Sequence, residues 1–408
     1  MTKTSPRILF VCYGGGHIAM ILPVMRKLRE MAPRAELVLM ALTIAGRRAR
    51  DAGEKPLGYA DFLHLRDRER VLAHGRRLVG TAPGSDVPED ETLAYLGINY
   101  SDLEDALGVA GAAERFAEQG RRGFYPEAFM RDVVAEIAPD VVVATNSPRS
   151  ERAARAAACA LGVPCLALND LLPVQAGEFV GRGFWPDRLC VLSQSVADFL
   201  VREGAPSERV LVTGNPAFDT MMSDKTQDAA RAVLRARGWE RLKPILFSGD
   251  VDFLEQGEAQ YTQVYQIVDV LEAYVKARPD TALILRYHPS RWMNMKRPEP
   301  HPRIHFAVTP EEPPHPQILA SDVAVVQEST IALEASIAGK PLISLEKLDG
   351  RVPVTSWEDE GVSKGCHTLN ALPGLLDEAL DGKSDQDRPF KTDGRAAFRI
   401  GETILSLT

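Results

Sequence analysis

The sequence lacks the features that mark membrane-spanning, disulfide-linked and zinc-binding chains. No window of about 20 apolar residues occurs, which is the length a transmembrane helix needs. The five cysteines are odd in number and no two have C-x-x-C spacing, a pattern typical of a reducing compartment without structural zinc. The apolar run at residues 8–12 breaks into glycines and is too short for a signal peptide. We therefore expect a cytoplasmic protein with at most peripheral membrane contact.

The chain also lacks an excess of positive charge. Its 408 residues include 48 Lys and Arg against 56 Asp and Glu, a net charge of -8. Nucleic acid is not an expected partner, because its phosphates are bound by clustered Lys and Arg. The sequence does contain one arginine run, which is either a solvated helix face or a patch for an anionic acceptor or membrane surface: Arg66, Arg68, Arg70, Arg76 and Arg77. Oligomeric state is not set by any of these features.

What the sequence does contain is a regular alternation of short apolar runs and helical segments. Solid apolar runs are typical of parallel strands buried on both faces. Ten runs predict strands, at residues 7–12, 35–42, 140–145, 164–169, 188–193, 209–214, 244–249, 282–289, 322–327 and 341–346. Helical periodicity lies between them, for example at residues 17–31, 150–162, 263–277 and 329–339. The alternation predicts an α/β protein with two Rossmann-like, doubly wound domains facing a cleft.

The length suits two domains, and the strand pattern restarts near residue 243. We place the first domain at residues 1–218 and the second at 219–385. Residues 386–408 are expected to form a terminal helix that packs back on the first domain. The polar stretch from about residue 53 to 127 is interpreted as a helical insertion in the first domain.

The first strand is followed by Gly14, Gly15, Gly16 and His17. Glycines allow a sharp turn and the close approach of a ligand, and a helix N-terminus offers free N–H groups. We expect the helix N-terminus to lower the pKa of His17, so that a neutral imidazole can act as a general base. The alternative is a tight turn with a histidine that only packs. The pattern is not G-x-G-x-x-G and no acid ends the second strand, so a dinucleotide site is disfavoured.

Two loops of the second domain carry polar residues at predicted strand ends. Ser248 and Gly249 can donate hydrogen bonds to an anion, and Asp250 and Asp252 can bind a sugar hydroxyl or act as a base. His288 ends the next strand and can hydrogen-bond a phosphate. A plain strand–helix turn is the alternative for the first loop, and a surface histidine before a proline-capped loop is the alternative for the second.

A third loop follows Gln327 at the end of its strand. Ser329 or Thr330 is expected to cap a helix over residues 331–338, which Gly339 ends. Glu334 lies about one turn into this helix, where its carboxylate can accept hydrogen bonds from two ribose hydroxyls. A capped amphipathic helix without a ligand is the alternative.

These motifs together resemble those of glycosyltransferases with two Rossmann-like domains, the GT-B type. The string "GGGHIAMILPVMRKL" is similar to the glycine loop and histidine helix of lipid II N-acetylglucosaminyltransferases and of UDP-dependent small-molecule glycosyltransferases. The segment "ESTIALEASIAGKP" resembles their donor-nucleotide motif, with Glu334 as the ribose-binding glutamate. "VLVTGNPAFD", residues 210–219, is similar to the segment that closes the first domain in UDP-N-acetylglucosamine 2-epimerases, which share the fold.

Two departures bear on the reaction. The acid and histidine strings of the epimerases are replaced by "ATNSPRS" and "ALNDLLP". We expect this to remove their acid/base pair, which favours transfer over epimerisation. The "HP" and "ST" pairs also resemble transferases that use CMP-sugars or CDP-glycerol, so the nucleotide base stays open.

The resemblance implies a metal-independent glycosyltransferase without a cofactor. It would move a sugar from a nucleotide-sugar, UDP-linked or CMP-linked, to a hydroxyl of a carbohydrate or lipid-linked acceptor, in surface polysaccharide or glycoconjugate synthesis. His17 would be the base, and the acceptor would lie near Gly14, Gly15, Gly16 and Asn146. The donor would be held by Ser248, Gly249, His288, Gln327, Ser329, Thr330 and Glu334. The alternatives are a UDP-N-acetylglucosamine 2-epimerase-like enzyme, a CDP-glycerol-type glycerophosphotransferase and an inactive nucleotide-sugar-binding protein.

Overall fold

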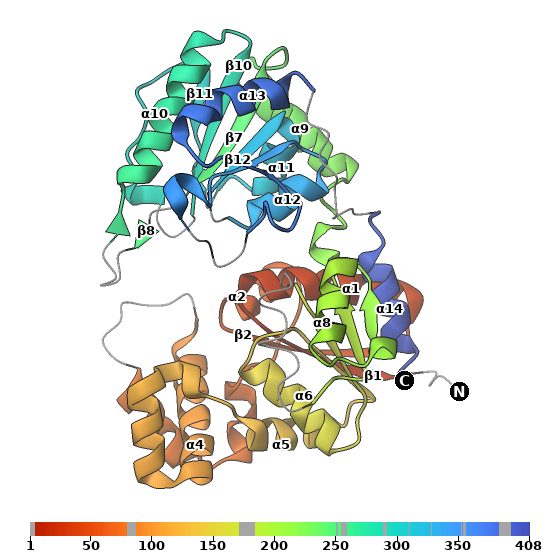
Figure 1. Ribbon diagram of the computed structural model, residues 1–408. Coiled ribbons are helices and arrows are strands. Elements are labelled where there is room, and N and C mark those ends of the chain that lie inside the picture. Colours follow the sequence, from red (N-terminus) through yellow and green to blue (C-terminus); the bar gives the residue numbers. More distant parts are fainter. Residues whose placement is uncertain are drawn as a thin grey trace. The chain divides into compact units, whose positions relative to one another are not determined.

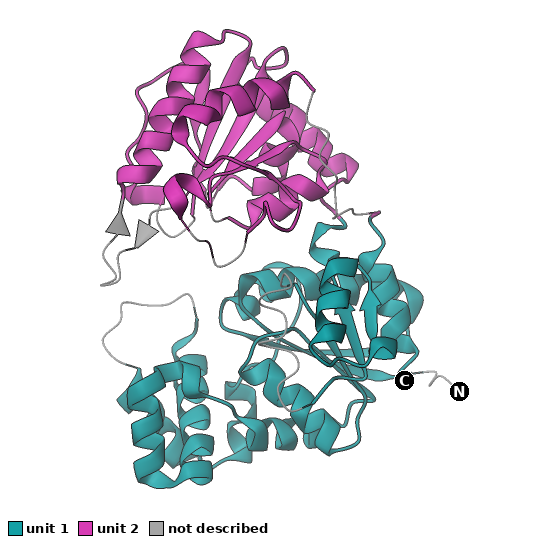
Figure 2. Ribbon diagram, viewed as in Figure 1, with its two compact units in different colours: residues 1–219, 394–408 teal, residues 220–393 magenta. Residues whose placement is uncertain are grey.

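The chain folds into two compact α/β units, seen in a computed structural model (Figures 1 and 2). Unit 1 comprises Met1–Asp219 and Gly394–Thr408, and unit 2 comprises Thr220–Asp393. The structure describes residues 5–79, 87–170, 184–249, 252–253, 259–288, 292–309, 311–327, 329–351, 353, 356–382 and 393–408.

Unit 1 is built on a parallel six-stranded sheet of order β2-β1-β3-β4-β5-β6. Its strands are β1 Arg7–Tyr13, β2 Glu36–Leu42, β3 Val141–Ala144, β4 Cys165–Leu168, β5 Arg188–Val191 and β6 Val210–Val212. Alternate residues of β1 face opposite layers, as a pleated strand requires. Ile8 and Phe10 pack in one hydrophobic cluster, and Leu9 and Val11 in another.

Helices cover both faces of this sheet. The cluster of Ile8 and Phe10 also contains side chains of α1 and α14, and that of Leu9 and Val11 contains side chains of α5 and α6. The helices of unit 1 outside the insertion are α1 Gly14–Met31, α2 Ile44–Asp51, α5 Glu127–Ile137, α6 Ser150–Ala160, α8 Gln194–Arg202 and α14 Ala396–Leu405. The Asp219 carboxylate accepts hydrogen bonds from the N–H groups of Ala396 and Ala397, at 3.1 and 2.7 Å, and so caps α14. Short 3₁₀ turns lie at Ser207–Arg209 and Pro216–Phe218.

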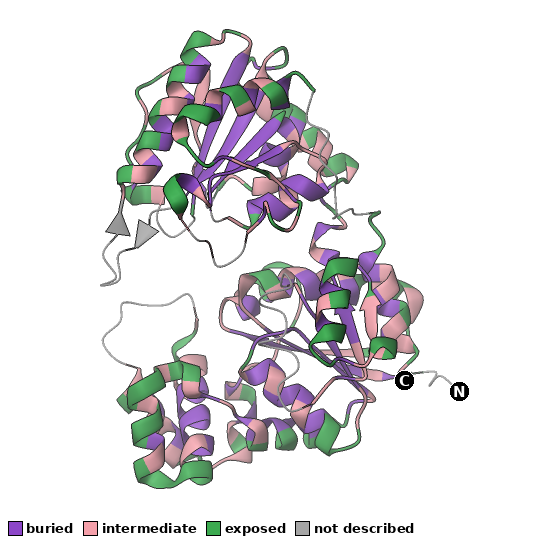
Figure 3. Cartoon of the chain, in the orientation of Figure 1, coloured by how far each residue is buried: buried purple, intermediate pink, exposed green. Residues whose placement is uncertain are grey.

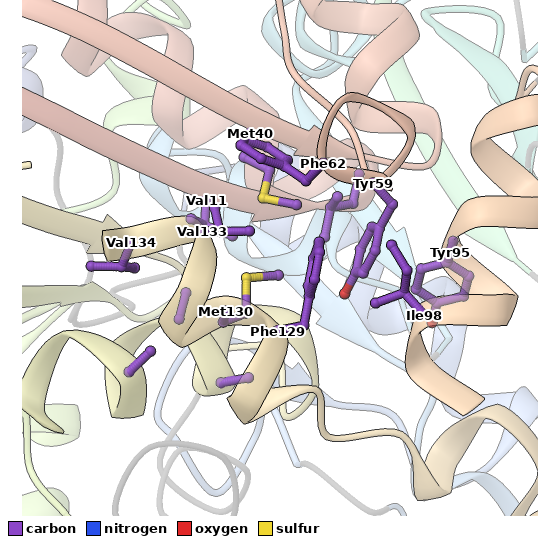
Figure 4. Packing of buried hydrophobic residues seen from close by; sticks show 14 of the residues in the cluster. Val11, Met40, Tyr59, Phe62, Tyr95, Ile98, Phe129, Met130, Val133 and Val134 are labelled. Carbon is purple, nitrogen blue, oxygen red and sulfur yellow. The ribbon is translucent and has the colours of Figure 1, made fainter. Parts of the chain in front are cut away.

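The insertion in unit 1 is helical, as the sequence predicts. It contains α3 Arg68–Leu78, α4 Glu89–Gln119 and 3₁₀ turns at Ala60–Leu65 and Gly120–Gly123. Gly108 interrupts α4 with φ +74°. Aromatic residues join the insertion to α5: Tyr59 stacks on Phe129 with ring centroids 4.9 Å apart (Figure 4).

The arginine run lies in this insertion, and its members differ in their partners. Arg66 Nε is 3.2 Å from Asp102, and Arg70 Nη2 is 2.9 Å from Glu104. Arg77 lies over the ring of Tyr100. These contacts favour an internally paired helix face over a free basic patch.

Unit 2 has a second parallel six-stranded sheet, of order β11-β10-β7-β12-β13-β14. Its strands are β7 Lys243–Gly249, β10 Thr281–Tyr287, β11 Ile304–Phe306, β12 Val323–Val326, β13 Leu342–Ser344 and β14 Lys364–Gly365, with a separate antiparallel pair, β8 Asp252–Phe253 and β9 Ala259–Gln260. Its helices are α9 Asp224–Arg235, α10 Thr262–Ala277, α11 Pro314–Ala320, α12 Ile331–Ile337 and α13 Leu372–Leu380, with 3₁₀ turns at Trp292–Asn294, Leu348–Gly350 and Leu369–Ala371. Figure 3 shows the strands of both sheets as largely buried.

All ten predicted strands are confirmed, together with their parallel arrangement. The sequence analysis missed β11 and β14, which are edge strands, and the β8–β9 pair. Helix α1 begins at Gly14, three residues before the predicted start, so the glycines form its first turn. No helix in the described parts of the chain is long and apolar enough to cross a membrane.

Candidate functional site

The two sheets each have a point where the chain order reverses, and most of the candidate residues lie at these points. In unit 1 the reversal lies between β1 and β3, and in unit 2 between β7 and β12. Ligands of open parallel sheets bind at the carboxyl ends of the strands beside such a point.

In unit 1, His17 is held by a buried carboxylate. Its Nδ1 lies 3.0 Å from Glu151 Oε1 and 2.9 Å from Thr145 Oγ1. The Thr145 hydroxyl also donates to Glu151 Oε1, and the Tyr13 N–H donates to the same oxygen at 2.7 Å. Tyr13 ends β1, Thr145 follows β3 and Glu151 is in the first turn of α6. The reversal point thus joins three elements around one carboxylate, which is fully buried.

A second carboxylate lies on the other side of the imidazole. His17 Nε2 is 4.0 Å from Asp170 Oδ2, which is beyond hydrogen-bond distance. Asp170 follows β4, in the string "ALNDLLP". The expectation that these strand ends lack an acid/base pair is therefore contradicted, since Glu151 and Asp170 both flank His17.

The expected lowering of the His17 pKa is wrong. Burial does lower it, but the hydrogen bond and charge of Glu151 and the charge of Asp170 outweigh burial and raise the pKa to about 9. The partial charge of a helix N-terminus is about half an elementary charge, and here it faces two carboxylates. His17 therefore carries a proton at neutral pH in the free protein.

The three glycines before His17 differ in whether their conformation or their surroundings require the lack of a side chain. Gly14 has φ +81°, a conformation that favours glycine. At Gly15 a Cβ atom would lie 2.6 Å from Arg48 Nη1, which donates to the Gly15 carbonyl at 2.8 Å. Gly16 has no neighbour within 4 Å of such an atom, so its lack of a side chain is not required by packing.

Asn146 follows Thr145 and is buried beside the same strand ends. Its Nδ2 donates to Asn169 Oδ1 at 3.1 Å across the ends of β3 and β4. Asn146 follows Thr145 in the sequence and Asn169 precedes Asp170, so this hydrogen bond joins the two segments that flank His17. Arg149 stacks its guanidinium over the Tyr13 ring at 4.7 Å, at the same edge.

In unit 2, the residues around the reversal point come into direct contact. Ser248 Oγ donates to Ser329 Oγ at 3.0 Å, and the Gln327 N–H donates to the Ser248 carbonyl at 3.1 Å. A Cβ atom at Gly249 would lie 2.5 Å from the Phe247 ring and 2.9 Å from Gln327 Oε1. The Phe247 ring of β7 and the Gln327 side chain therefore leave no room for a side chain at this position.

Helix α12 begins as predicted, and the hydroxyl that caps it belongs to Ser329, the residue before the N-cap position. Thr330 occupies the N-cap position, while the Ser329 hydroxyl accepts the N–H of Ile331 at 3.3 Å. Glu334 is partly buried on α12, and its Oε2 lies 3.3 Å from His315 Nε2 on α11. Gly339, with φ +72°, follows the helix.

The remaining predicted donor residues are His288 and Thr330. His288 follows β10, which is on the other side of β7 from β12, and its side chain is exposed. Thr330 is exposed as well. Asp250 and the side chain of Asp252 lie outside the described residues.

Sequence reasoning missed Glu151, Asp170, Thr145 and His315. The first three could have been found, because each lies at the end of, or in the segment after, the predicted strand at residues 140–145 or 164–169, and parallel strands bring these segments to one edge of the sheet. His315 carries no such signal. The described residues include no group of three or more His, Cys, Asp or Glu side chains placed to hold a metal ion.

Comparisons with known proteins identify the fold. No family model and no curated protein sequence matches the chain. Among solved structures, the UDP-GlcNAc 2-epimerase of Neisseria meningitidis, bound to UDP-GlcNAc, aligns with a TM-score of 0.62 at 14% identity, covering 98% of this chain and 100% of that chain. The 2-epimerase of Methanocaldococcus jannaschii gives 0.59 at 12% identity over 98% and 99%.

A variant of the wall teichoic acid polymerase TagF gives a TM-score of 0.52 at 12% identity, over 99% of this chain and 89% of that chain. Identities this low establish the fold alone. The chain therefore has the GT-B fold of two Rossmann-like domains, which it shares with UDP-GlcNAc 2-epimerases and TagF.

Proposed function

We propose that the chain is an enzyme that transfers a glycosyl group from a nucleotide-sugar to a hydroxyl acceptor. Unit 2 binds the donor through the residues around its reversal point, and unit 1 supplies the base that activates the acceptor. The observation that carries the proposal is the His17 imidazole, held through Nδ1 by the buried Glu151. This is the arrangement of a general base whose other nitrogen meets the substrate.

The proton transfer runs through Nε2 of His17. Nδ1–H donates to Glu151, so Nε2 accepts the proton of the acceptor hydroxyl. The acceptor oxygen bonds to the anomeric carbon while the bond from that carbon to the phosphate oxygen breaks, and the electron pair stays on the phosphate. Glu151 stabilises the imidazolium that forms.

The raised pKa gives this step a characteristic pH dependence. With a pKa of about 9, only about 1% of His17 is neutral at pH 7. Turnover is expected to rise about tenfold for each pH unit until the pH approaches 9.

The donor is held in unit 2 by hydroxyl and carboxylate groups. Ser248 and Ser329 lie 3.0 Å apart and can both donate to a phosphate once it displaces their mutual hydrogen bond. Glu334 can accept hydrogen bonds from the ribose hydroxyls. UDP-sugars are the favoured donors, because the aligned N. meningitidis structure contains UDP-GlcNAc, and CMP-sugars are the second choice.

The test measures consumption of UDP-GlcNAc and of a CMP-sugar with and without a panel of sugar and lipid-linked acceptors. We expect consumption to require an acceptor and to fall by at least about 100-fold in His17→Gln, the typical effect of losing a general base. His64→Gln is a matched control, because His64 also contacts a carboxylate, Glu136, but lies in the exposed insertion. Unchanged turnover in His17→Gln would refute the assigned base.

Epimerisation of a UDP-sugar is the second candidate, and the two carboxylates beside His17 favour it. Asp170, which is partly exposed, would remove and return a proton at a sugar carbon, with His17 as a protonated partner held by the buried Glu151. In that case donor is converted to its epimer with no acceptor present. Glycerol phosphate transfer from CDP-glycerol would instead require an acceptor and leave CMP.

A further inference from the structure

Next to Glu334 lies a histidine that belongs to a different helix. His315 is the second residue of α11, and its Nε2 is 3.3 Å from Glu334 Oε2. The exposed side-chain fractions are 27% for His315 and 15% for Glu334, so most of the contact is shielded from water. Helices α11 and α12 pack together and bring the two side chains into contact.

Glu334 is oriented by charge on its buried side. Its Oε2 is buried, and within the described part of the chain no group donates a hydrogen bond to it, since the His315 contact is not aligned as one. Arg286 is buried in the same region and donates to Gln317 Oε1 at 2.9 Å and to the Glu312 carbonyl at 2.7 Å. Burial lowers the pKa of Arg286, and the charges of Glu334 and Glu312 act against this. The buried oxygen of Glu334 therefore lies against the His315 ring, and the Arg286 charge acts on Glu334 from the same region.

We propose that His315 is a positioning residue that fixes the Glu334 carboxylate toward a ribose diol, so that unit 2 selects ribonucleotides over 2′-deoxyribonucleotides. The inference rests on the proposed function, in which Glu334 binds the donor ribose. A carboxylate whose Oε2 lies against the His315 ring has Oε1 left to accept hydrogen bonds from hydroxyl donors. A 2′-deoxy nucleotide removes one such donor and leaves a partly buried charge less well paired.

The test measures dissociation constants of UDP, CMP and their 2′-deoxy analogues by isothermal titration calorimetry. We expect the wild type to prefer the ribonucleotide by about tenfold or more, the usual effect of a hydrogen bond to a charged group. Glu334→Gln should abolish most of this preference. His315→Ala should reduce it to about twofold, and His315→Gln, which places a polar amide beside Glu334, should restore part of it. His64→Ala is the control and should keep the wild-type ratio.

Each other outcome has a defined meaning. A wild-type ratio in His315→Ala overturns the role of His315 and leaves the proposed function standing, because Glu334→Gln tests the latter separately. A further loss when His315→Ala is added to Glu334→Gln means that His315 contacts the nucleotide itself, which also overturns the positioning role. Failure of the wild type to bind UDP or CMP overturns both the proposed function and this inference. The unfolding midpoint of each variant, measured in urea, checks that the fold is retained.

Discussion

Replacing Glu151 by Gln removes the charge that holds a proton on His17 while keeping a side chain of similar shape. The difference between the ordinary pKa of 6.5 and the raised value of about 9 corresponds to about 3 kcal/mol. In Glu151→Gln, burial still lowers the pKa and Asp170, at 4.0 Å, still raises it. We expect the His17 pKa to fall to about 6.5 or below.

The sign of the stability effect follows from the direction of this shift. Because the folded-state pKa of His17 is above its unfolded value, the stabilisation is fully present below about pH 6.5 and is lost as pH rises through about 9. Wild type should therefore lose about 3 kcal/mol of unfolding free energy over this range relative to His17→Gln. Glu151→Gln should lose much less than wild type.

The assay is an NMR titration of the histidine side chains, of which the chain has eight. The His17 signal is assigned by its loss in His17→Gln. Glu136→Gln, which removes the carboxylate partner of the exposed His64, is a matched control and should leave the His17 pKa unchanged. A His17 pKa near 6.5 in the wild type, or an equal pKa in wild type and Glu151→Gln, would refute the reasoning.

Two further predictions concern the stability of the fold. Gly249→Ala should destabilise the fold by about 1–3 kcal/mol, because its Cβ would overlap the Phe247 ring. Gly16→Ala should be neutral or should stabilise the fold by about 0.5–1 kcal/mol, because its Cβ would meet no neighbour. Urea unfolding of both variants checks this, and equal changes in unfolding free energy would contradict it. Asp219→Ala should lower the unfolding free energy by about 1 kcal/mol, because it removes the cap of α14. Asp219→Asn should lower it less, because an amide oxygen can still accept a hydrogen bond. Urea unfolding midpoints test this, and an Asn variant as unstable as the Ala variant would show that the cap is not the cause.

The sheets could be predicted because parallel strands that are buried on both faces are continuous apolar runs in the sequence. Runs such as residues 140–145 and 322–327 are apolar on both faces, and the structure makes β3 and β12 of them. β11 was not predictable in this way, because its three residues are only half-buried at a sheet edge. β14 has two residues and no apolar side chain.

The candidate site was predictable in its location but not in its electrostatics. The glycine loop and the ends of the predicted strands gave His17, Ser248 and Ser329. The pKa of His17 depends on Glu151, which is 134 positions away in the sequence and reaches it only through the pairing of β1 with β3. The arginine run shows the same limit, since Arg66 and Arg70 pair with Asp102 and Glu104 of α4, more than 30 positions away in the sequence.

The account depends most on the claim that unit 2 binds a nucleotide through Glu334. The direct measurement is the thermal unfolding of wild type and Glu334→Ala with UDP, CMP, CDP, GDP, ADP and NAD. A ligand at about 100 times its dissociation constant stabilises the folded state by about 2.7 kcal/mol, which raises the unfolding temperature by several degrees. We predict such a shift with UDP or CMP in the wild type and its loss in Glu334→Ala. No shift with any of the six compounds, or an equal shift in the variant, would contradict the account.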